Sequence, residues 1–315
     1  MKTVNFLKMV KSKLNLLPMF ILLGVLVITS CDNEEEAIAE MVEKSIVEVA
    51  SEAGQFSNLI EAAQKAGLAD FLSTEDNLTV FAPTDDAFAM LLTDLGLNSL
   101  DDIDATTLGS ILKYHVIGNK VMSSDLSTGY FPTLSTFSGN NLSVFVNITD
   151  GVAINKNTNV TAADIEASNG VIHVIDKVIL PPSVVNIALD NDNFTTLVAA
   201  VVKAGLVDAL SAEGPFTVFA PTNDAFAALF SDLGVAGIED LTTQQLAPIL
   251  TYHVVLGNVL STDLENGEVG TLNEGKKLNI NVSAGVKINS SSVVVADIQG
   301  ANGVVHVIDK VLIPQ

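Results

Sequence analysis

The four histidines are the residues of this chain with the widest chemical range, since a neutral imidazole can act as a general base or bind a metal ion. They fall into two pairs, His115 with His253 and His173 with His306. The first pair follows a tyrosine at the end of an apolar stretch, and the second stands inside aliphatic runs. None has a second histidine or a cysteine at ligand spacing, so the pattern favours structural hydrogen bonding over metal binding or base catalysis.

The acidic residues offer weaker candidates for chemistry. Asp176 and Asp309 stand next to lysine near the end of an apolar run, which predicts polar anchors with satisfied hydrogen bonds. The segment DNDN at 190–193 resembles a calcium loop superficially, but Thr195 and Val201 stand where such a loop has glycine and an acid. The sequence has no Gly-x-Ser-x-Gly elbow, phosphate loop or dinucleotide glycine run. We therefore expect no catalytic residue, no cofactor and no metal site.

The composition excludes further classes of function. Acidic residues outnumber basic ones 37 to 15, the net charge is −22, and every basic residue is a lysine. Such a surface repels phosphate backbones and lacks the bidentate arginine fork, so nucleic acid is not an expected partner. The single cysteine, Cys31, excludes an intrachain disulfide and a multi-thiolate metal cluster.

The N-terminal residues are typical of an export signal. Lysines come first, the apolar run Leu14–Ile28 follows, and small residues precede Cys31. The alternative is a transmembrane anchor, but the run is short for a span and contains Pro18. The sequence therefore predicts a signal peptide over residues 1–30.

The tetrapeptide Ile28-Thr29-Ser30-Cys31 resembles a bacterial lipobox, which implies lipidation of Cys31. Several acyl chains at one cysteine would give stable membrane anchoring. The acidic cluster Asp32–Glu36 resembles the export tag of some Gram-negative lipoproteins, and residues 31–43 are also predicted to form an acidic tether. We expect a lipid-anchored protein of the outer membrane that faces the cell exterior.

The rest of the chain repeats itself. The box TVFAPT-x-DAF begins at Thr79 and at Thr217, and a Tyr-His pair keeps the same spacing after each copy. The box NGV-x-HVIDKV begins at Asn169 and again at Asn302. Repeats of this length are whole domains rather than solenoid units. The predicted domains cover residues 44–182 and 183–315, and Pro181-Pro182 forms a stiff join between them.

The elements that position these residues follow from hydrophobic spacing. Apolar residues at i, i+3, i+4 and i+7 predict helices, and Thr84 and Thr222 are predicted helix N-caps before acidic or amide residues. Alternating residues at 142–148 and 278–282 predict half-buried strands, and Val171–Leu180 reads as a strand buried on both faces. Helices come first and strands follow, so the class is α+β. The helical stripes are Phe56–Ala63, Phe88–Leu95, Leu108–Leu112, Phe194–Val201 and Phe226–Leu233.

These duplicated boxes resemble those of the fasciclin domain family. The resemblance covers both copies and implies two tandem fasciclin-like domains, each with N-terminal helices packed on a C-terminal, mostly antiparallel strand wedge. The Tyr-His boxes, Tyr114-His115 and Tyr252-His253, are among the motifs that carry it. The family is associated with cell adhesion and matrix binding and is not known as a catalytic scaffold. The implied partners are extracellular matrix, a glycan or a cell-surface protein.

Some animal members bind receptors through Asp-Ile within a Glu-Pro-Asp-Ile-Met segment. The matching pairs here are Asp164-Ile165 and Asp297-Ile298, which makes them a candidate adhesion segment. The flanking Glu-Pro and Met are absent from both copies. A turn acid beside a buried aliphatic residue is therefore the favoured interpretation.

Three functions follow from these observations. The first is a non-catalytic surface lipoprotein for adhesion or matrix binding. The alternative is a carrier of an apolar small molecule such as a carotenoid, because the chain is apolar enough to leave a groove between helices and strands. An auxiliary enzyme acting on polysaccharide ranks last, since it would need two acids facing each other across a cleft.

Overall fold

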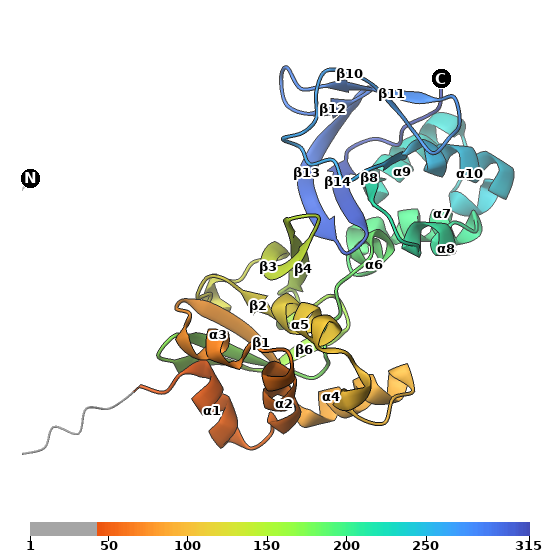
Figure 1. The fold of residues 1–315 in the computed structure, drawn as a ribbon. Coiled ribbons are helices and arrows are strands. Elements are labelled where there is room, and N and C mark those ends of the chain that lie inside the picture. Colours follow the sequence, from red (N-terminus) through yellow and green to blue (C-terminus); the bar gives the residue numbers. More distant parts are fainter. Residues whose placement is uncertain (1–42) are drawn as a thin grey trace, which may run out of the picture. The chain divides into compact units, whose positions relative to one another are not determined.

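The computed structural model describes residues 43–315, which contain two copies of one α+β arrangement (Figure 1). The predicted α+β class and the tandem duplication are confirmed. We call the part from α1 to β7 the first repeat and the part from α6 to β14 the second repeat. The predicted signal peptide and the predicted lipidation site Cys31 lie outside the described residues.

The first repeat begins with three helices and carries its remaining helices between β1 and β3. Its helices are α1 (Ile46–Ala53), α2 (Ser57–Lys65), α3 (Ala69–Thr74), α4 (Asp85–Leu95) and α5 (Ala105–Tyr114), with 3-10 turns η1 (Leu100–Asp102) and η2 (Ser123–Asp125). Its strands are β1 (Leu78–Pro83), β2 (Val116–Ile117), β3 (Gly129–Phe137), β4 (Asn140–Asn147), β5 (Ala153–Ile154), β6 (Thr158–Ala167) and β7 (Gly170–Ile175).

The second repeat has the same order of elements. Its helices are α6 (Val184–Leu189), α7 (Thr195–Lys203), α8 (Val207–Ser211), α9 (Asn223–Leu233) and α10 (Thr243–Tyr252), with η3 (Asp192–Phe194) and η4 (Ile238–Asp240). Its strands are β8 (Phe216–Pro221), β9 (Val254–Leu256), β10 (Gly267–Gly270), β11 (Lys277–Asn281), β12 (Lys287–Ile288), β13 (Ser291–Gly300) and β14 (Gly303–Ile308).

Both repeats build a seven-stranded sheet with one topology. The order is β2-β1-β7-β6-β5-β4-β3 in the first repeat and β9-β8-β14-β13-β12-β11-β10 in the second. The central pairs β1 with β7 and β8 with β14 are parallel, and the other named strand pairings are antiparallel. The sheet is therefore mixed and mostly antiparallel, as the family resemblance implied.

The predicted order of helices first and strands afterwards is wrong at one position in each repeat, at β1 and at β8. The TVFAP residues form β1, a central strand that the chain completes before α4. Val80 and Ala82 pack in the cluster with the helices, whereas Phe81 packs in the cluster on the other face of the sheet. Because β1 is buried on both faces, it lacks the alternation that marks a half-buried strand.

Two further expectations need correction at their ends. The strand predicted over Val171–Leu180 begins at Gly170 and stops at Ile175, and the carboxylate of the next residue, Asp176, accepts a hydrogen bond from the backbone N–H of Asn159 on the neighbouring strand. In α4 the stripe residues Phe88 and Leu91 are buried, but Leu95 is 50% exposed next to the left-handed Gly96 that ends the helix.

The N-caps behave as the local sequence requires. The hydroxyl of Thr84 accepts a hydrogen bond from the N–H of Ala87, and Thr222 accepts one from Ala225. No helix within residues 43–315 is long and apolar enough to cross a membrane.

Candidate functional site

His115 and His253 end helices α5 and α10 and are fully buried. In His115, Nδ1 donates to the carbonyl of Ile111 at 2.8 Å, and Nε2 accepts the N–H of Ile179 at 3.1 Å. His253 makes the same two bonds, to Ile249 and from Leu312. Each ring is thus held as one neutral tautomer, and neither nitrogen is free to bind a metal ion or accept a proton from a substrate.

Burial also sets the proton affinity of this pair. Desolvation lowers the pKa of His115 and of His253 to about 4, although the hydrogen bond that each ring gives to a helix carbonyl raises the pKa slightly. Both rings are therefore neutral at neutral pH, which suits a structural role.

This shift predicts a loss of stability in mild acid. An unfolded histidine titrates near 6.5, so between pH 6.5 and 4 the unfolded chain binds more protons than the folded chain. As the pH falls from 6.5 to 4, the free energy of unfolding should fall by about 3 kcal/mol for each of the two residues. Above pH 6.5 this contribution to stability is fully present. Urea titrations of the parent and of His253→Gln between pH 7 and 4 measure this, and the variant should lose about 3 kcal/mol less than the parent across the window, because the other titrating groups, including Asp190, are common to both proteins. An unchanged slope in that variant would contradict the assignment.

His173 and His306 lie in the central strands β7 and β14 and have no exposed surface. Nδ1 of His173 accepts the backbone N–H of Asp164 at 3.2 Å, and Nε2 donates to the carbonyl of Val121 at 3.0 Å. His306 repeats the pattern with Asp297 and Val259. Each ring therefore links its own strand to a bulge in the neighbouring strand. It also links that strand to the loop before η2 in the first repeat, or to the equivalent loop in the second repeat.

The bulge is the same in both repeats. Register shifts interrupt the pairing of β6 with β7 and of β13 with β14 where Asp164 and Asp297 stand. Both aspartates have left-handed backbones, with φ of 60° and 62°. Each carboxylate accepts bonds from the backbone N–H and the hydroxyl of a serine, Ser123 or Ser261. The serine hydrogen bonds also hold the pKa of Asp164 below its ordinary value.

Serine, aspartate and histidine therefore meet in each repeat, but their connections are not those of a nucleophilic triad. In a triad the serine bonds to the histidine and the aspartate orients the other ring nitrogen. Here the serine bonds to the aspartate, and His173 Nδ1 is 4.0 Å from the nearest Asp164 oxygen. Both nitrogens of His173 already bond to backbone groups, so no base is available to activate Ser123.

The candidate adhesion segment is partly closed by this arrangement. Ile298 is 1% exposed in the core of the second repeat, and Ile165 packs against the core of the first. The side chains of Asp164 and Asp297 are about one-third exposed. A partner at this segment would therefore meet the edges of two carboxylates rather than the isoleucines.

The tyrosines of the Tyr-His pairs tie helix to sheet. The hydroxyl of Tyr114 donates to the carbonyl of Ser143 and accepts a bond from Asn155. Tyr252 does the same with Lys277 and Asn289. Burial raises the pKa of Tyr114 above its ordinary value.

Asp176 and Asp309 hold the ends of the central strands β7 and β14. The carboxylate of Asp176 accepts bonds from the backbone and side chain of Asn159. Asp309 accepts bonds from Ser291 and Ser292; burial opposes its ionisation, but these hydrogen bonds keep its pKa below the usual value. Both aspartates thus act as anchors between neighbouring strands.

The acidic loop at 190–193 does not gather ligands for a cation. Asp190 caps the end of α6, and the side chain of Asn191 accepts the N–H of Asn193 just before α7. Burial raises the pKa of Asp190 to about 7. Within residues 43–315, no group of three His, Cys, Asp or Glu side chains is placed to hold a metal ion. In the same part of the chain, every buried side-chain nitrogen or oxygen has a hydrogen-bond partner.

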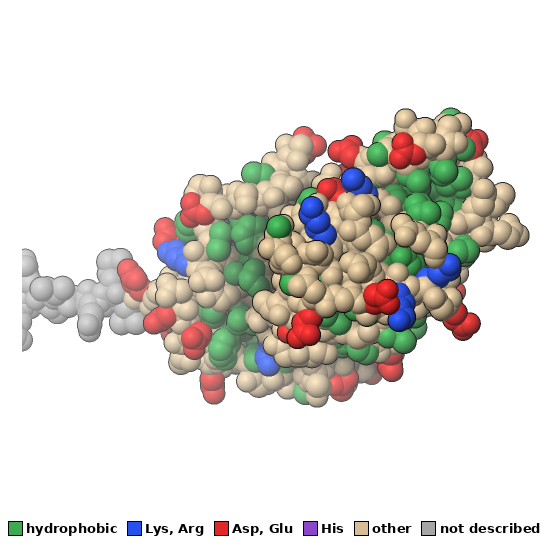
Figure 2. All heavy atoms as spheres, turned by 90° about the horizontal axis from the view of Figure 1, so that it is seen from above, with side chains coloured by type: hydrophobic (Ala, Val, Ile, Leu, Met, Phe, Trp, Pro, Cys, Tyr) green, Lys and Arg blue, Asp and Glu red, His purple; other side chains and the backbone are tan. Residues whose placement is uncertain are grey.

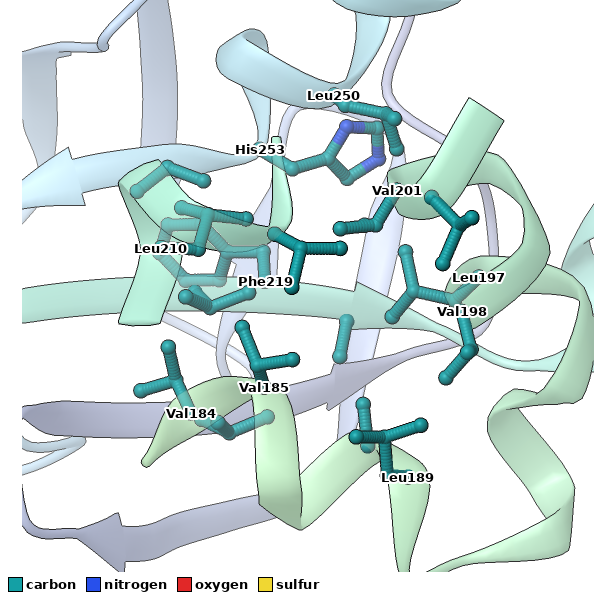
Figure 3. Close-up of a pocket in the computed structure, with 17 residues that line it drawn as sticks. Val184, Val185, Leu189, Leu197, Val198, Val201, Leu210, Phe219, Leu250 and His253 are labelled. Atoms are coloured by element: carbon teal, nitrogen blue, oxygen red, sulfur yellow. The ribbon is translucent and has the colours of Figure 1, made fainter. Parts of the chain in front are cut away.

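A cavity lies between the helices and the central strands of the second repeat. It has a volume of about 120 Å³, and the side chains around it come from α6, α7, α8, α10, β8 and β14 (Figure 3). The equivalent position in the first repeat holds about 30 Å³. The predicted carrier of an apolar molecule would need such a space, and that alternative stays a prediction.

Comparison with known proteins identifies the shared fold. A family model of the fasciclin domain matches residues 54–181 and again residues 192–314. This chain belongs to the fasciclin domain family. The predicted family and fold are thereby confirmed.

Several fasciclin relatives are known. A Synechocystis protein named sll1483 is 50% identical over 133 residues, which is 42% of this chain and 73% of that protein. Transforming growth factor-beta-induced protein ig-h3 from Sus scrofa is 34% identical over 279 residues, covering 86% of this chain but only 38% of its own length. The solved FAS1 domain pair of the insect cell adhesion molecule fasciclin I aligns with a TM-score of 0.53 at 20% identity, covering 83% of this chain and 98% of that chain.

Sequence reasoning missed two features of the fasciclin repeats. It gave no role to the Asn-Gly that opens the NGV box, although the buried side chains of Asn169 and Asn302 each make three hydrogen bonds. It also missed the difference between the two cavities. A residue-by-residue alignment of the two copies shows the substitutions that underlie the difference between the cavities.

Proposed function

We propose that this chain is a non-catalytic cell-surface protein that binds extracellular matrix, a glycan or another surface protein through its two fasciclin domains. The main support for the proposal is that the histidine and serine side chains, which could serve in catalysis, already have hydrogen-bond partners within the protein. All four histidines use both ring nitrogens, and the serines beside Asp164 and Asp297 bond to the carboxylates. A tandem pair of these domains in an insect cell adhesion molecule supports the same function.

The surface chemistry suggests how binding would occur. Acidic side chains are spread over the face shown in Figure 2, in keeping with a net charge of −22. A partner with positive charge would be attracted to such a surface, and salt would screen that attraction. We infer that binding weakens as the ionic strength rises.

The proposed setting is a lipid anchor at Cys31 in the outer membrane, with the fasciclin domains facing the cell exterior. Its support is the order of lysines, apolar run and small residues before the only cysteine. Cys31→Ser should release the protein from the membrane fraction, as a blot of fractionated cells would show. Retention of the Cys31→Ser protein in that fraction would contradict acylation at this residue.

Purified protein on an array of matrix proteins and glycans tests the binding function. We expect saturable binding to at least one component. The affinity should fall several-fold between about 50 and 500 mM salt, because the added ions screen the charges on both partners. Cells that lack the gene should attach less well to that component. Absence of binding on the array, together with unchanged attachment of the deletion strain, would overturn the proposal.

The Asp-Ile segment can be tested within the same assay. Asp164→Asn and Asp297→Asn keep the size of each side chain and remove its charge. If this segment contacts the partner, the double variant should bind more weakly than the parent. Because each carboxylate also accepts two hydrogen bonds from Ser123 or Ser261, the unfolding temperature should fall as well, so binding is compared at a temperature at which circular dichroism shows both proteins to be folded. Asp101→Asn, at an exposed acid outside the segment, serves as the control.

A further inference from the structure

The cavity of the second repeat is lined almost wholly by aliphatic side chains. His253 is the polar exception, and its two ring nitrogens already bond to Ile249 and Leu312. No donor or acceptor therefore faces the space unpaired. A ligand that carried polar groups into it would lose hydrogen bonds to water without replacement.

The first repeat gives an internal standard for this cavity. Three residues around the cavity are valines where the first repeat has isoleucines, namely Val184, Val198 and Val305. Each of these valines has one methylene group fewer than its isoleucine counterpart. The isoleucine counterparts are Ile46, Ile60 and Ile172. Loss of buried methylenes opens space that a packed core would otherwise fill.

At two other positions the second repeat adds apolar groups to the wall of the cavity. Val201 and Val207 stand where the first repeat has Ala63 and Ala69. Although these valines add methyl groups, the second cavity is still about four times as large, 120 against 30 Å³. The second repeat therefore combines a larger space with a more continuous aliphatic lining.

The mouth of the cavity is also more apolar in the second repeat than in the first. Leu189 is 43% exposed and Val202 is 60% exposed, and both line the cavity. Their counterparts in the first repeat are the polar residues Ser51 and Gln64. The exposed part of a leucine or valine at a cavity mouth does not stabilise the fold, but it would gain free energy by covering an apolar ligand.

We propose that the second repeat binds an aliphatic chain in this cavity, and that the first repeat does not. An apolar cavity of about 150 Å³ lined by Leu, Ile and Phe can bind benzene. At about 120 Å³ the present space suits one end of an alkyl chain, while Leu189 and Val202 contact the part that emerges. Figure 3 shows Val198 and Val201 of α7 facing Val184 and Val185 of α6 around this space.

Methyl NMR of the purified protein with 1-octanol as the probe tests this assignment. We expect saturable shifts for methyl groups of Val198, Val201 and Leu210, and no comparable shift for Ile60 or Leu72 in the first repeat. Equal shifts in both repeats, or no saturable shift in either, would overturn the proposal. Neither outcome bears on adhesion, which uses the exterior surface.

Variants borrowed from the first repeat sharpen the test. Val184→Ile with Val198→Ile restores the isoleucines that the first repeat packs at these positions, and should weaken octanol binding at least tenfold. Val202→Gln changes an exposed residue and should weaken binding several-fold without loss of folding. Ile60→Val makes the reverse change in the first repeat and should leave the octanol affinity of the second repeat unchanged. Parental affinity in both second-repeat variants would contradict binding at this cavity.

Discussion

Gly303→Ala is expected to destabilise the second repeat by about 3 to 5 kcal/mol, among the largest effects of one methyl group. A Cβ atom at this position would lie 2.2 Å from the carbonyl oxygen of Phe216 on the paired strand β8. The same contact recurs in the first repeat, where a Cβ at Gly170 would lie 2.1 Å from the oxygen of Leu78. Since the obstacle is backbone, relief requires the parallel central strands to separate.

Urea unfolding followed by circular dichroism measures this effect in Gly303→Ala and Gly170→Ala. Gly129→Ala is the matched control, because Gly129 also lies in a strand but a Cβ there would meet no atom within 4 Å. We expect the control to unfold within about 0.5 kcal/mol of the parent. Equal midpoints for Gly303→Ala and the control would show that the strands can part without loss.

Local patterns predicted the elements whose residues lie close together in sequence. The stripe from Phe88 through Leu91 describes α4, and Thr84 caps it as expected, because a helix is set by contacts within four residues. The exposed Leu95 shows where this reasoning stops, since tertiary packing decides how far a stripe stays buried. Strand β1 escaped detection because a strand covered on both faces has no polar side.

Contacts between distant residues could not be predicted from either copy alone. The glycine of each NGV box is required by a strand about 90 residues earlier, and the spacing within the box carries no sign of that partner. The same holds for the bond from Asp164 to His173, which depends on a bulge in β6. The difference between the cavities became visible only when the counterparts of Val184 and Val198 were known to line the same space.

Asn302→Ala should cost about 2 to 4 kcal/mol, because it leaves two buried backbone groups and one part-buried carbonyl without their partner. The side-chain oxygen of Asn302 accepts the N–H of Val184 at 2.8 Å, and its amide donates to the carbonyls of Leu210 and Ala212 at 2.9 Å. One side chain thus holds the start of α6 and the end of α8 to the start of β14. Asn169 makes the matching bonds in the first repeat, so Asn169→Ala should have a similar cost.

Asn302→Asp separates the donor bonds from the acceptor bond. The acid keeps an oxygen for the Val184 amide, but at neutral pH its second oxygen would face the two carbonyl oxygens that the amide group now satisfies. We therefore expect a loss at least as large as in the alanine variant, together with faster hydrogen exchange at Leu210 and its neighbours. Asn193→Ala, at an exposed asparagine, should leave both stability and exchange unchanged. If α6 and α8 kept their protection in Asn302→Ala, the anchoring would have to come from apolar packing instead, because these three bonds are the polar links that this side chain makes between the helices and the central strand.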